Sequence, residues 1–447
     1  MKKLSVFRVL YTLLSALIII GGSYLAIMYA QGNYRITKDG LLLESGLLSA
    51  NSFPTGAQVY INDDLKTATN DTIYLEPGEY QVRLIKDGYS PWEKTLVIEK
   101  ELVTQTDARL FPTAPSLTPL TFTGVENLLP SPDGRKIVYY TASASAQTRN
   151  GLYVLDLNDS INPFQRTSRQ IAVDVPVYDL ANANFIWSPD SSQLLIISHL
   201  KNILIDVNQS NNLQSLPDVS LRRSQILSEW EEEMYLRERQ YLAEFPPEII
   251  EIATQSAKNV YISPDKKKLL YTATANTTLS DKLTPPLPST NTQPQSRSLK
   301  PDNTYVYDRE EDKNFLVTQA FEELVSINKA LLADDLDQKM PRNLVASPSA
   351  FSRLQQQNIA STATQFNAYH TSLVINTLQW FSDSNHLLFI EDGKVQIVAY
   401  DGTNKTTLYS GPFEKSFVYP WTDGSRIIVL TAFSPDSPKN LYSIELK

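Results

Sequence analysis

The sequence predicts a mainly β protein in three parts: an N-terminal transmembrane helix, a small β-sandwich, and a β-propeller of about five to seven blades with helical insertions. Three observations carry this prediction. A long apolar run opens the chain, short alternating segments separated by turn residues follow it, and one hairpin motif recurs five times along the remaining sequence. Alternation with a period of two is typical of strands, and a recurring unit is typical of a repeat architecture.

The N-terminal apolar run extends over residues 9–30 and contains no charged side chain. About 20 predominantly apolar residues are enough for a helix to cross the hydrocarbon core of a bilayer. The run follows the basic residues Lys2, Lys3 and Arg8, and no acidic residue occurs before Asp39. The positive-inside rule therefore predicts a single-pass protein of the cell membrane, with the N-terminus in the cytoplasm and the later domains outside. The predicted anchor residues are Val9, Leu13, Leu14, Leu17, Ile18, Ile19, Ile20, Leu25 and Ile27.

A cleaved signal peptide is the alternative, because it also begins with basic residues before an apolar stretch. Ala26 and Ala30 are small enough for a cleavage site, but Met28 fits the small-x-small pattern poorly. The run also exceeds the usual signal-peptide core of about 7–15 residues. The sequence therefore favours a retained helix, in which residues 1–32 form the cytoplasmic tip and anchor and residues 33–51 form a juxtamembrane linker.

The composition excludes several classes of function. The chain contains 40 Lys and Arg against 49 Asp and Glu, a formal net charge of −9, which argues against nucleic acid or anionic lipid as a partner. It contains no cysteine, so disulfides, thiolate metal sites and cysteine nucleophiles are excluded.

Residues 52–112 consist of short alternating segments between turn residues, which predicts a small β-sandwich. Three pieces occur in order: residues 54–61 (Pro-Thr-Gly-Ala-Gln-Val-Tyr-Ile), 75–80 (Leu-Glu-Pro-Gly-Glu-Tyr) and 88–89 (Gly-Tyr). Together they resemble the PEGA domain family, although residues 62–69 replace the glycine-rich hairpin usual after its first strand. The resemblance implies a compact sandwich of surface-exposed prokaryotic envelope proteins, in contact with wall or surface-layer material and without catalytic residues. The residues that carry it are Pro54, Thr55, Gly56, Ala57, Pro77, Gly78, Gly88 and Tyr89.

Five aromatic residues of this region, Tyr60, Tyr74, Tyr80, Tyr89 and Trp92, admit two interpretations. Gathered on one exposed face, their flat apolar rings would form a platform for a sugar. Packed into the core and turns, they would serve only the fold, which is the usual place of aromatic residues in strands. The second interpretation is favoured.

Residues 120–447 repeat a unit in which an aspartate-containing turn leads into one apolar strand and a second apolar strand follows, which predicts a hairpin or meander. Proline, aspartate and glycine are the residues that such turns require. Because one hairpin cannot bury its own faces, radial stacking into a β-propeller is expected, and three tryptophans beside the turns are expected to wedge between adjacent sheets. The pattern resembles the WD-like repeats of TolB-type propellers, which transfers no catalytic residue. The turn residues are Ser131, Pro132, Asp133, Trp187, Ser188, Pro189, Asp190, Ser263, Pro264, Asp265, Trp380, Asp383, Trp421 and Asp423.

Two stretches interrupt the repeats and predict helical insertions, near residues 221–256 and near residues 319–369. The first carries apolar residues at helical spacing, so it either covers a face or edge of the propeller or docks a partner, and the first role is favoured. Residues 284–303 are rich in Pro, Ser, Thr, Asn and Gln and are expected to lack fixed structure.

Motifs for catalysis are absent from the sequence: it has no Gly-x-Ser-x-Gly elbow, nucleotide loop or dinucleotide fingerprint. His199, His370 and His386 have no context of a triad or ligand set, and Asp334, Asp335 and Asp337 lack the glycine and glutamate of a standard calcium loop. We therefore expect no catalytic residue, no cofactor and no metal.

The sequence thus predicts a membrane-anchored extracytoplasmic binding or scaffold protein of a prokaryotic cell envelope. Its PEGA-like and propeller surfaces would contact a protein or a glycan, and no nucleic acid. The alternative is a propeller-based envelope enzyme, a lyase or a hydrolase, that uses polar groups at the mouth of the propeller.

Overall fold

The structure is a computed structural model that describes residues 6–30, 34–36, 42–157, 168–285, 287, 291–318, 378–414, 417–434 and 437–447. The chain divides into two compact units. The first unit comprises Met1–Leu110 and Leu287–Gln293, and the second comprises Phe111–Pro286 and Pro294–Lys447. The fold is mainly β, as the sequence predicts, with three α-helices among the described residues.

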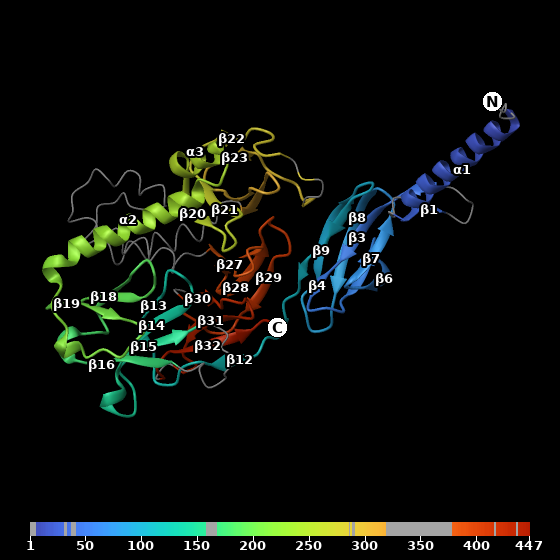
Figure 1. The fold of residues 1–447 in the computed structure, drawn as a ribbon. Coiled ribbons are helices and arrows are strands. Elements are labelled where there is room, and N and C mark those ends of the chain that lie inside the picture. The colour runs from blue at the N-terminus through green and yellow to red at the C-terminus, as the bar shows by residue number, and fades with distance from the viewer. Residues whose placement is uncertain are drawn as a thin grey trace. The chain divides into compact units, whose positions relative to one another are not determined.

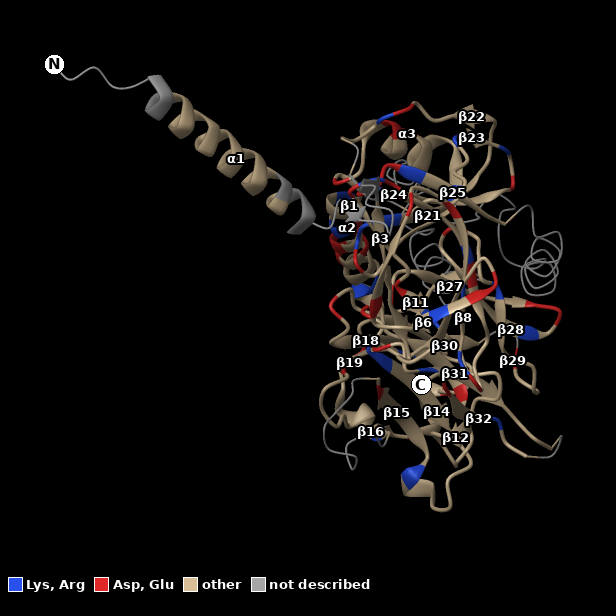
Figure 2. Cartoon of the chain, turned by 90° about the vertical axis from the view of Figure 1, so that its right-hand side faces the viewer, with Lys and Arg blue, Asp and Glu red and all other residues tan. Residues whose placement is uncertain are grey.

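Helix α1, Val6–Ala30, opens the chain. Arg8 lies in its first turns, and from Leu10 onward the helix contains no Lys, Arg, Asp or Glu (Figure 2). The described side chains along it are largely exposed, and Leu13, Leu17 and Ile20 are 64%, 70% and 70% exposed. Within the described part of the chain, no helix has the length and apolar character needed to cross a membrane. Strands β1, Tyr34–Ile36, and β2, Leu42–Glu44, follow as an antiparallel pair.

The first unit contains a three-stranded sheet in the order β10-β3-β7, a four-stranded sheet in the order β6-β5-β8-β9, and the short pair β11-β4 (Figure 1). The pairings of β10 with β3 and of β11 with β4 are parallel. The bounds are β3 Gly46–Ala50, β4 Ser52–Phe53, β5 Gln58–Ile61, β6 Asp64–Ala68, β7 Asp71–Leu75, β8 Gly78–Ile85, β9 Trp92–Ile98, β10 Val103–Gln105 and β11 Ala108–Arg109.

One hydrophobic core joins these sheets. In β5, Val59 and Ile61 are buried while Gln58 is exposed, so the alternation of the sequence separates an inner from an outer face. Leu48 of β3 lies in the same core as Val59 and as Leu84 of β8. Two sheets that share a core in this way form two packed layers.

The second unit contains five larger sheets among its described residues, each built of antiparallel neighbours. We number them in chain order. Sheet 1 is β13 Glu126–Pro130, β14 Lys136–Thr141, β15 Gly151–Asp156 and β16 Arg169–Val173; sheet 2 is β17 Asn184–Trp187, β18 Gln193–Ile197 and β19 Asn202–Asp206; sheet 3 is β20 Ala257–Ile262, β21 Lys268–Ala273, β24 Thr304–Asp308 and β25 Lys313–Thr318. Sheet 4 is β26 Leu378–Trp380, β27 His386–Glu391, β28 Lys394–Ala399 and β29 Thr406–Tyr409; sheet 5 is β30 Val418–Pro420, β31 Arg426–Thr431, β32 Asn440–Glu445 and β12 Leu117–Pro119.

Successive sheets share hydrophobic cores. Separate clusters join sheets 1 and 2, sheets 3 and 4, sheets 4 and 5, and sheets 5 and 1. Strand β12, near the start of the unit, completes sheet 5 by pairing with β32 near its end. The first and last parts of the unit are therefore held in one sheet.

Two helices stand between sheets 2 and 3 in the chain: α2, Arg223–Leu242, and α3, Pro247–Gln255. The buried face of α2 packs on sheet 2, and α3 packs on sheet 3. These helices occupy the predicted insertion near residues 221–256, and the pattern of burial gives α2 the covering role. The insertion predicted near residues 319–369 lies outside the described residues.

The expectation that residues 284–303 lack fixed structure is wrong for the part that the structure describes. Strand β23, Ser298–Leu299, pairs with β22, Thr277–Thr278, and the side chain of Asn314 donates a hydrogen bond of 2.7 Å to the Ser296 carbonyl. Gln293 is only 9% exposed. Specific hydrogen bonds hold this segment, although its composition is typical of disorder.

Candidate functional site

The turn between the first two strands has one geometry in all five sheets of the second unit. Its fourth residue donates a backbone hydrogen bond to the first and has a positive φ, and its third residue is the aspartate that the sequence marks. In the first three turns the aspartate carboxylate accepts a hydrogen bond of 3.1 Å from the backbone N–H two residues later. The turns begin at Ser131, Ser188, Ser263, Phe381 and Trp421. The repeat aspartates therefore form turns and do not converge on one cleft.

The tryptophans beside these turns occupy two different positions. Trp187 donates its indole N–H to the Leu129 carbonyl of sheet 1 at 3.2 Å, and Trp380 donates to the Tyr261 carbonyl of sheet 3 at 3.1 Å. Each indole thus reaches back to the preceding sheet. Trp421 instead starts its own turn and lies in the core shared by sheets 5 and 1.

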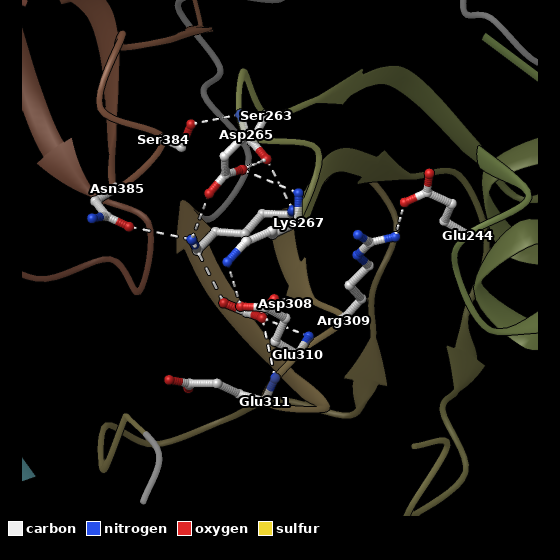
Figure 3. Close-up of polar contacts among 11 residues, drawn as sticks. Glu244, Ser263, Asp265, Lys267, Asp308, Arg309, Glu310, Glu311, Ser384 and Asn385 are labelled. Atoms are coloured by element: carbon white, nitrogen blue, oxygen red, sulfur yellow. Dashed lines mark hydrogen bonds and ion pairs between the residues drawn. The ribbon is translucent and has the colours of Figure 1, made fainter. Parts of the chain in front are cut away.

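Figure 3 shows the polar contacts in the turn region of sheet 3, with Asp265 and Asp308 of this sheet and Asn385 of sheet 4 among the residues drawn. A buried lysine organises this region. Lys268, the first residue of β21, lies with its Nζ 3.7 Å from carboxylate oxygens of both Asp265 and Asp308. The same Nζ donates to the Asn385 Oδ1 of sheet 4 at 3.2 Å and stands 4.8 Å from the ring centroid of Tyr400. The Lys268 and Asp308 side chains are 7% and 6% exposed. We call Lys268, Asp265, Asp308 and Asn385 the third-sheet cluster.

Exposed charges surround the third-sheet cluster. Lys267 pairs with Glu310 at 2.9 Å, and the hydrogen bond that Lys267 donates to the Glu310 carboxylate raises the pKa of Lys267 above its ordinary value. Arg309 pairs with Glu244, which follows α2 (Figure 3). Since the buried charges are paired and the exposed ones alternate in sign, this region joins sheets 3 and 4 and offers a polar surface.

The outer face of the four-stranded sheet in the first unit carries a second candidate surface. Leu65, Tyr60, Arg83 and Glu93 stand opposite one another across β6, β5, β8 and β9, and we call them the outer row. The Arg83 guanidinium lies 5.4 Å from the Tyr60 ring centroid and pairs with Asp63 at 2.9 Å. Leu65 is 56% exposed. The row combines an aromatic ring, a cation and an apolar side chain, a combination suited to a protein or a glycan.

The five aromatic residues singled out in this unit do not form one platform. Trp92 is 4% exposed and lies in the core, against which Tyr80 and Tyr89 also pack. Tyr60 belongs to the outer row, whereas Tyr74, 39% exposed, lies on β7 of the other sheet. Core packing therefore accounts for three of the five, and only Tyr60 joins a candidate surface.

The motif residues of the first unit shape turns. Gly56 and Gly88 have φ values of 77° and 78°, a conformation that favours glycine. Pro54, Thr55 and Ala57 surround Gly56 just before β5, Gly78 opens β8 directly after Pro77, and Tyr89 follows Gly88. None of these residues contributes to the outer row.

The two histidines that the structure describes, His199 and His386, lie in a turn and in a buried contact, respectively. His386 is 6% exposed and has its Nδ1 2.8 Å from an Asp383 carboxylate oxygen, with its ring against Phe111. His199 lies in the turn between β18 and β19, and His370 falls outside the described part of the chain, as do Asp334, Asp335 and Asp337. Where side chains are described, no group of three or more His, Asp or Glu residues is arranged to hold a metal ion.

Comparison with solved structures finds propeller proteins at low similarity. A TolB protein from Agrobacterium tumefaciens is 11% identical, with 72% of this chain and 79% of that chain covered and a TM-score of 0.21. TolB from Acinetobacter baumannii is 13% identical, with 87% and 64% covered and a TM-score of 0.17. An oligogalacturonate lyase in complex with manganese is 11% identical, with 86% and 81% covered and a TM-score of 0.20. Scores this low support no argument about function.

Comparison of the sequence with curated proteins finds no match. Comparison with protein families gives one specific result. Residues 45–114, which include all the motif residues named above, match the PEGA domain family. The resemblance inferred from three short motifs is thus confirmed for this part of the chain.

Proposed function

We propose that this protein is an extracytoplasmic binding or scaffold protein of a prokaryotic cell envelope, anchored in the membrane by its N-terminal helix. The match of residues 45–114 to the PEGA domain family is the observation that carries the proposal. The uncharged run of residues 9–30 and the basic residues before it support the anchor and its orientation.

We propose further that the five sheets of the second unit form a β-propeller in which α2 and α3 take the place of one contact between sheets. The shared cores between successive sheets and the pairing of β12 with β32 support this arrangement. A propeller of this kind presents loops at its two ends, and such loops commonly carry binding residues.

The outer row is the surface that we assign to the envelope partner. Tyrosine and arginine are enriched among the residues that dominate binding energies, because each combines a large contact area with a polar group. Leu65 adds exposed apolar area beside Tyr60, and the Arg83 guanidinium faces the same ring. A ligand laid across β6, β5 and β8 would contact all three side chains.

Fractionation of cells that express the full-length chain tests the anchor. Alkaline carbonate should leave the protein in the membrane pellet, and protease added to intact spheroplasts should digest it. Release by carbonate would refute the anchor, and protection from protease would refute the orientation.

A pull-down with full-length protein in detergent micelles tests the binding surface, with isolated cell-wall material and detergent-solubilised envelope proteins as separate probes. Tyr60→Ala with Arg83→Ala should weaken capture of one probe by roughly tenfold or more, as expected for dominant binding residues. Tyr74→Ala is the matched control, because Tyr74 is an exposed tyrosine on the other sheet. Equal capture by both variants would rule out the outer row, and turnover of wall glycan in the same samples would favour the enzyme alternative.

A further inference from the structure

Among the residues that the structure describes, β9 is an edge strand of the four-stranded sheet, because the sheet runs β6-β5-β8-β9 and only β8 pairs with it. An open edge presents unpaired backbone N–H and C=O groups to any strand that arrives, including the same strand of another copy. The chain covers this edge with side chains. Thr104 donates from its Oγ1 to the Val97 carbonyl at 3.2 Å.

Thr292 and Gln293, which belong to the same compact unit although they lie almost 200 positions later, cover the next groups of the edge. Thr292 Oγ1 accepts a hydrogen bond of 3.3 Å from the Val97 backbone N–H and lies 3.5 Å from the Thr95 carbonyl oxygen. Gln293 donates from its Nε2 to the same Thr95 carbonyl at 2.8 Å. We call these two residues the edge cap.

The chemistry of the edge cap resembles that of an added strand. A strand pairing with β9 would bring one N–H to the Thr95 carbonyl and one C=O to the Val97 N–H. A hydroxyl both donates and accepts, and a primary amide donates, so Thr292 and Gln293 together satisfy both backbone groups without forming a strand. The backbone N–H of Gln293 is itself bonded to Asn291 Oδ1 at 2.9 Å, which holds the cap in place.

We propose that residues Thr292 and Gln293 close β9 against pairing with β9 of a second copy of this chain. Under the proposed function, anchored copies of the chain share one membrane. The strand present at the highest local concentration near β9 is therefore β9 of another copy, and it competes with the edge cap for the same backbone groups. The contact would be antiparallel and two-fold symmetric, since the same edge would serve on both copies. The cap leaves the outer row untouched, so the two surfaces can be tested independently.

Hydrogen exchange read by mass spectrometry tests the closed state, on full-length protein in detergent micelles that hold one copy each, so that β9 of a second copy cannot replace the lost hydrogen bond. Thr292→Val with Gln293→Glu removes the hydroxyl and replaces the amide donor by an acceptor that repels the Thr95 carbonyl. The loss of the hydrogen bond should speed exchange in the peptide that contains Val97 by about 2- to 12-fold. Thr292→Ser keeps the hydroxyl and should exchange like the parent, and Thr278→Val, in the exposed part of β22, is the control for losing a threonine elsewhere.

Crosslinking tests the competing contact. Because the chain contains no cysteine, a single Thr95→Cys substitution gives one reactive site on an exposed side chain of β9. A short bis-maleimide should join two copies in the uncapped double variant and not in the capped parent. Unchanged exchange at Val97 would show that the edge does not depend on the cap, and unchanged crosslinking would show that it is no pairing surface. Either result overturns the proposal, while the outer-row pull-down remains a separate test of the proposed function.

Discussion

Replacing Lys268 by Met should destabilise the second unit, because the lysine is a buried cation within salt-bridge distance of the buried Asp308. Asp308 is 6% exposed, so its buried carboxylate would lose this cation and keep the hydrogen bonds that it accepts from the backbone N–H groups of Glu310 and Glu311. Breaking a buried pair by removing one partner costs about 3–5 kcal/mol. The separations of 3.7 Å are longer than direct hydrogen bonds, and Asp265 stays 33% exposed, so we expect the lower part of that range, about 3–4 kcal/mol.

Urea unfolding followed by tryptophan fluorescence measures this loss. Of the five tryptophans, Trp92 alone belongs to the first unit, so the signal reports mainly on the second. Lys267→Met is the matched control: its partner Glu310 is exposed, and exposed pairs contribute about 0–1 kcal/mol. Lys268→Met with Asp308→Asn should recover part of the loss, because the neutral amide no longer needs the cation while its oxygen still accepts the backbone bonds. Equal losses for Lys268→Met and Lys267→Met would refute the reasoning.

Three further outcomes follow from the same geometry. Trp187→Phe should cost about 1–3 kcal/mol more than Trp421→Phe in urea unfolding, because the first leaves the Leu129 carbonyl without its donor whereas the buried Trp421 Nε1 has no partner among the described residues; equal costs would count against the indole bond. Gly134→Ala should lower stability by about 1–2 kcal/mol, since its φ is 71° and a Cβ would stand 3.2 Å from the Tyr419 hydroxyl, and an unchanged midpoint would contradict this. Burial raises the pKa of Tyr139 to about 12, so between pH 10 and pH 12 the unfolded chain loses this proton first. Tyr139 should therefore add about 1.4 kcal/mol per pH unit to the fall in stability that the buried tyrosines produce together. Tyr139→Phe should make the slope shallower by about that amount, and an identical slope in both proteins would argue against it.

The positions of the repeated turns could be predicted from sequence because their chemistry is local. The aspartate is the third residue of each turn and the residue of positive φ is the fourth. This fourth position is occupied by Gly134, Ser191, Lys266, Ser384 and Gly424 in the five turns. The same offsets contain a signal that sequence reasoning missed. Trp421 stands two residues before its aspartate, whereas Trp187 stands three before its own, so the two indoles had to occupy different places.

A second signal that sequence reasoning missed lies in β13 and β20, the first strands of sheets 1 and 3. Asn127 and Asn259 each stand four residues before the serine that starts the turn, have φ values of 44° and 52°, and lie at irregularities in the pairing of β13 and β20. Asparagine tolerates this conformation better than most residues, so its recurrence at one offset predicts a bulge. The side chain of Asn127 also donates to the Leu180 and Ala183 carbonyls, which holds the loop that leads into sheet 2.

The edge cap and the third-sheet cluster could not have been found in this way. Each joins residues far apart in the sequence: Thr95 with Gln293, and Lys268 with Asn385. A segment rich in Pro, Ser, Thr and Gln is compatible both with disorder and with capture by a strand edge, and composition does not distinguish the two. What decides is whether a strand nearby has backbone groups left to satisfy, and that is a property of the assembled fold.

The helical insertion between sheets 2 and 3 had two possible roles, to cover a face or edge of the propeller or to dock a partner. The need of sheet 2 to bury its second face favours the covering role. Sheet 2 buries one face in the core that it shares with sheet 1, and its other face needs a separate cover. Ile226, Leu227, Trp230 and Met234 of α2 supply it by packing on Ile186 and Leu195. Arg237 then donates to the Pro189 carbonyl of sheet 2 at 2.9 Å, and Lys266 of sheet 3 stands 3.8 Å from the Tyr241 ring centroid. The apolar face of α2 is therefore buried within the fold, and its C-terminal half contacts both sheets. Any partner of this helix must bind its exposed charged face.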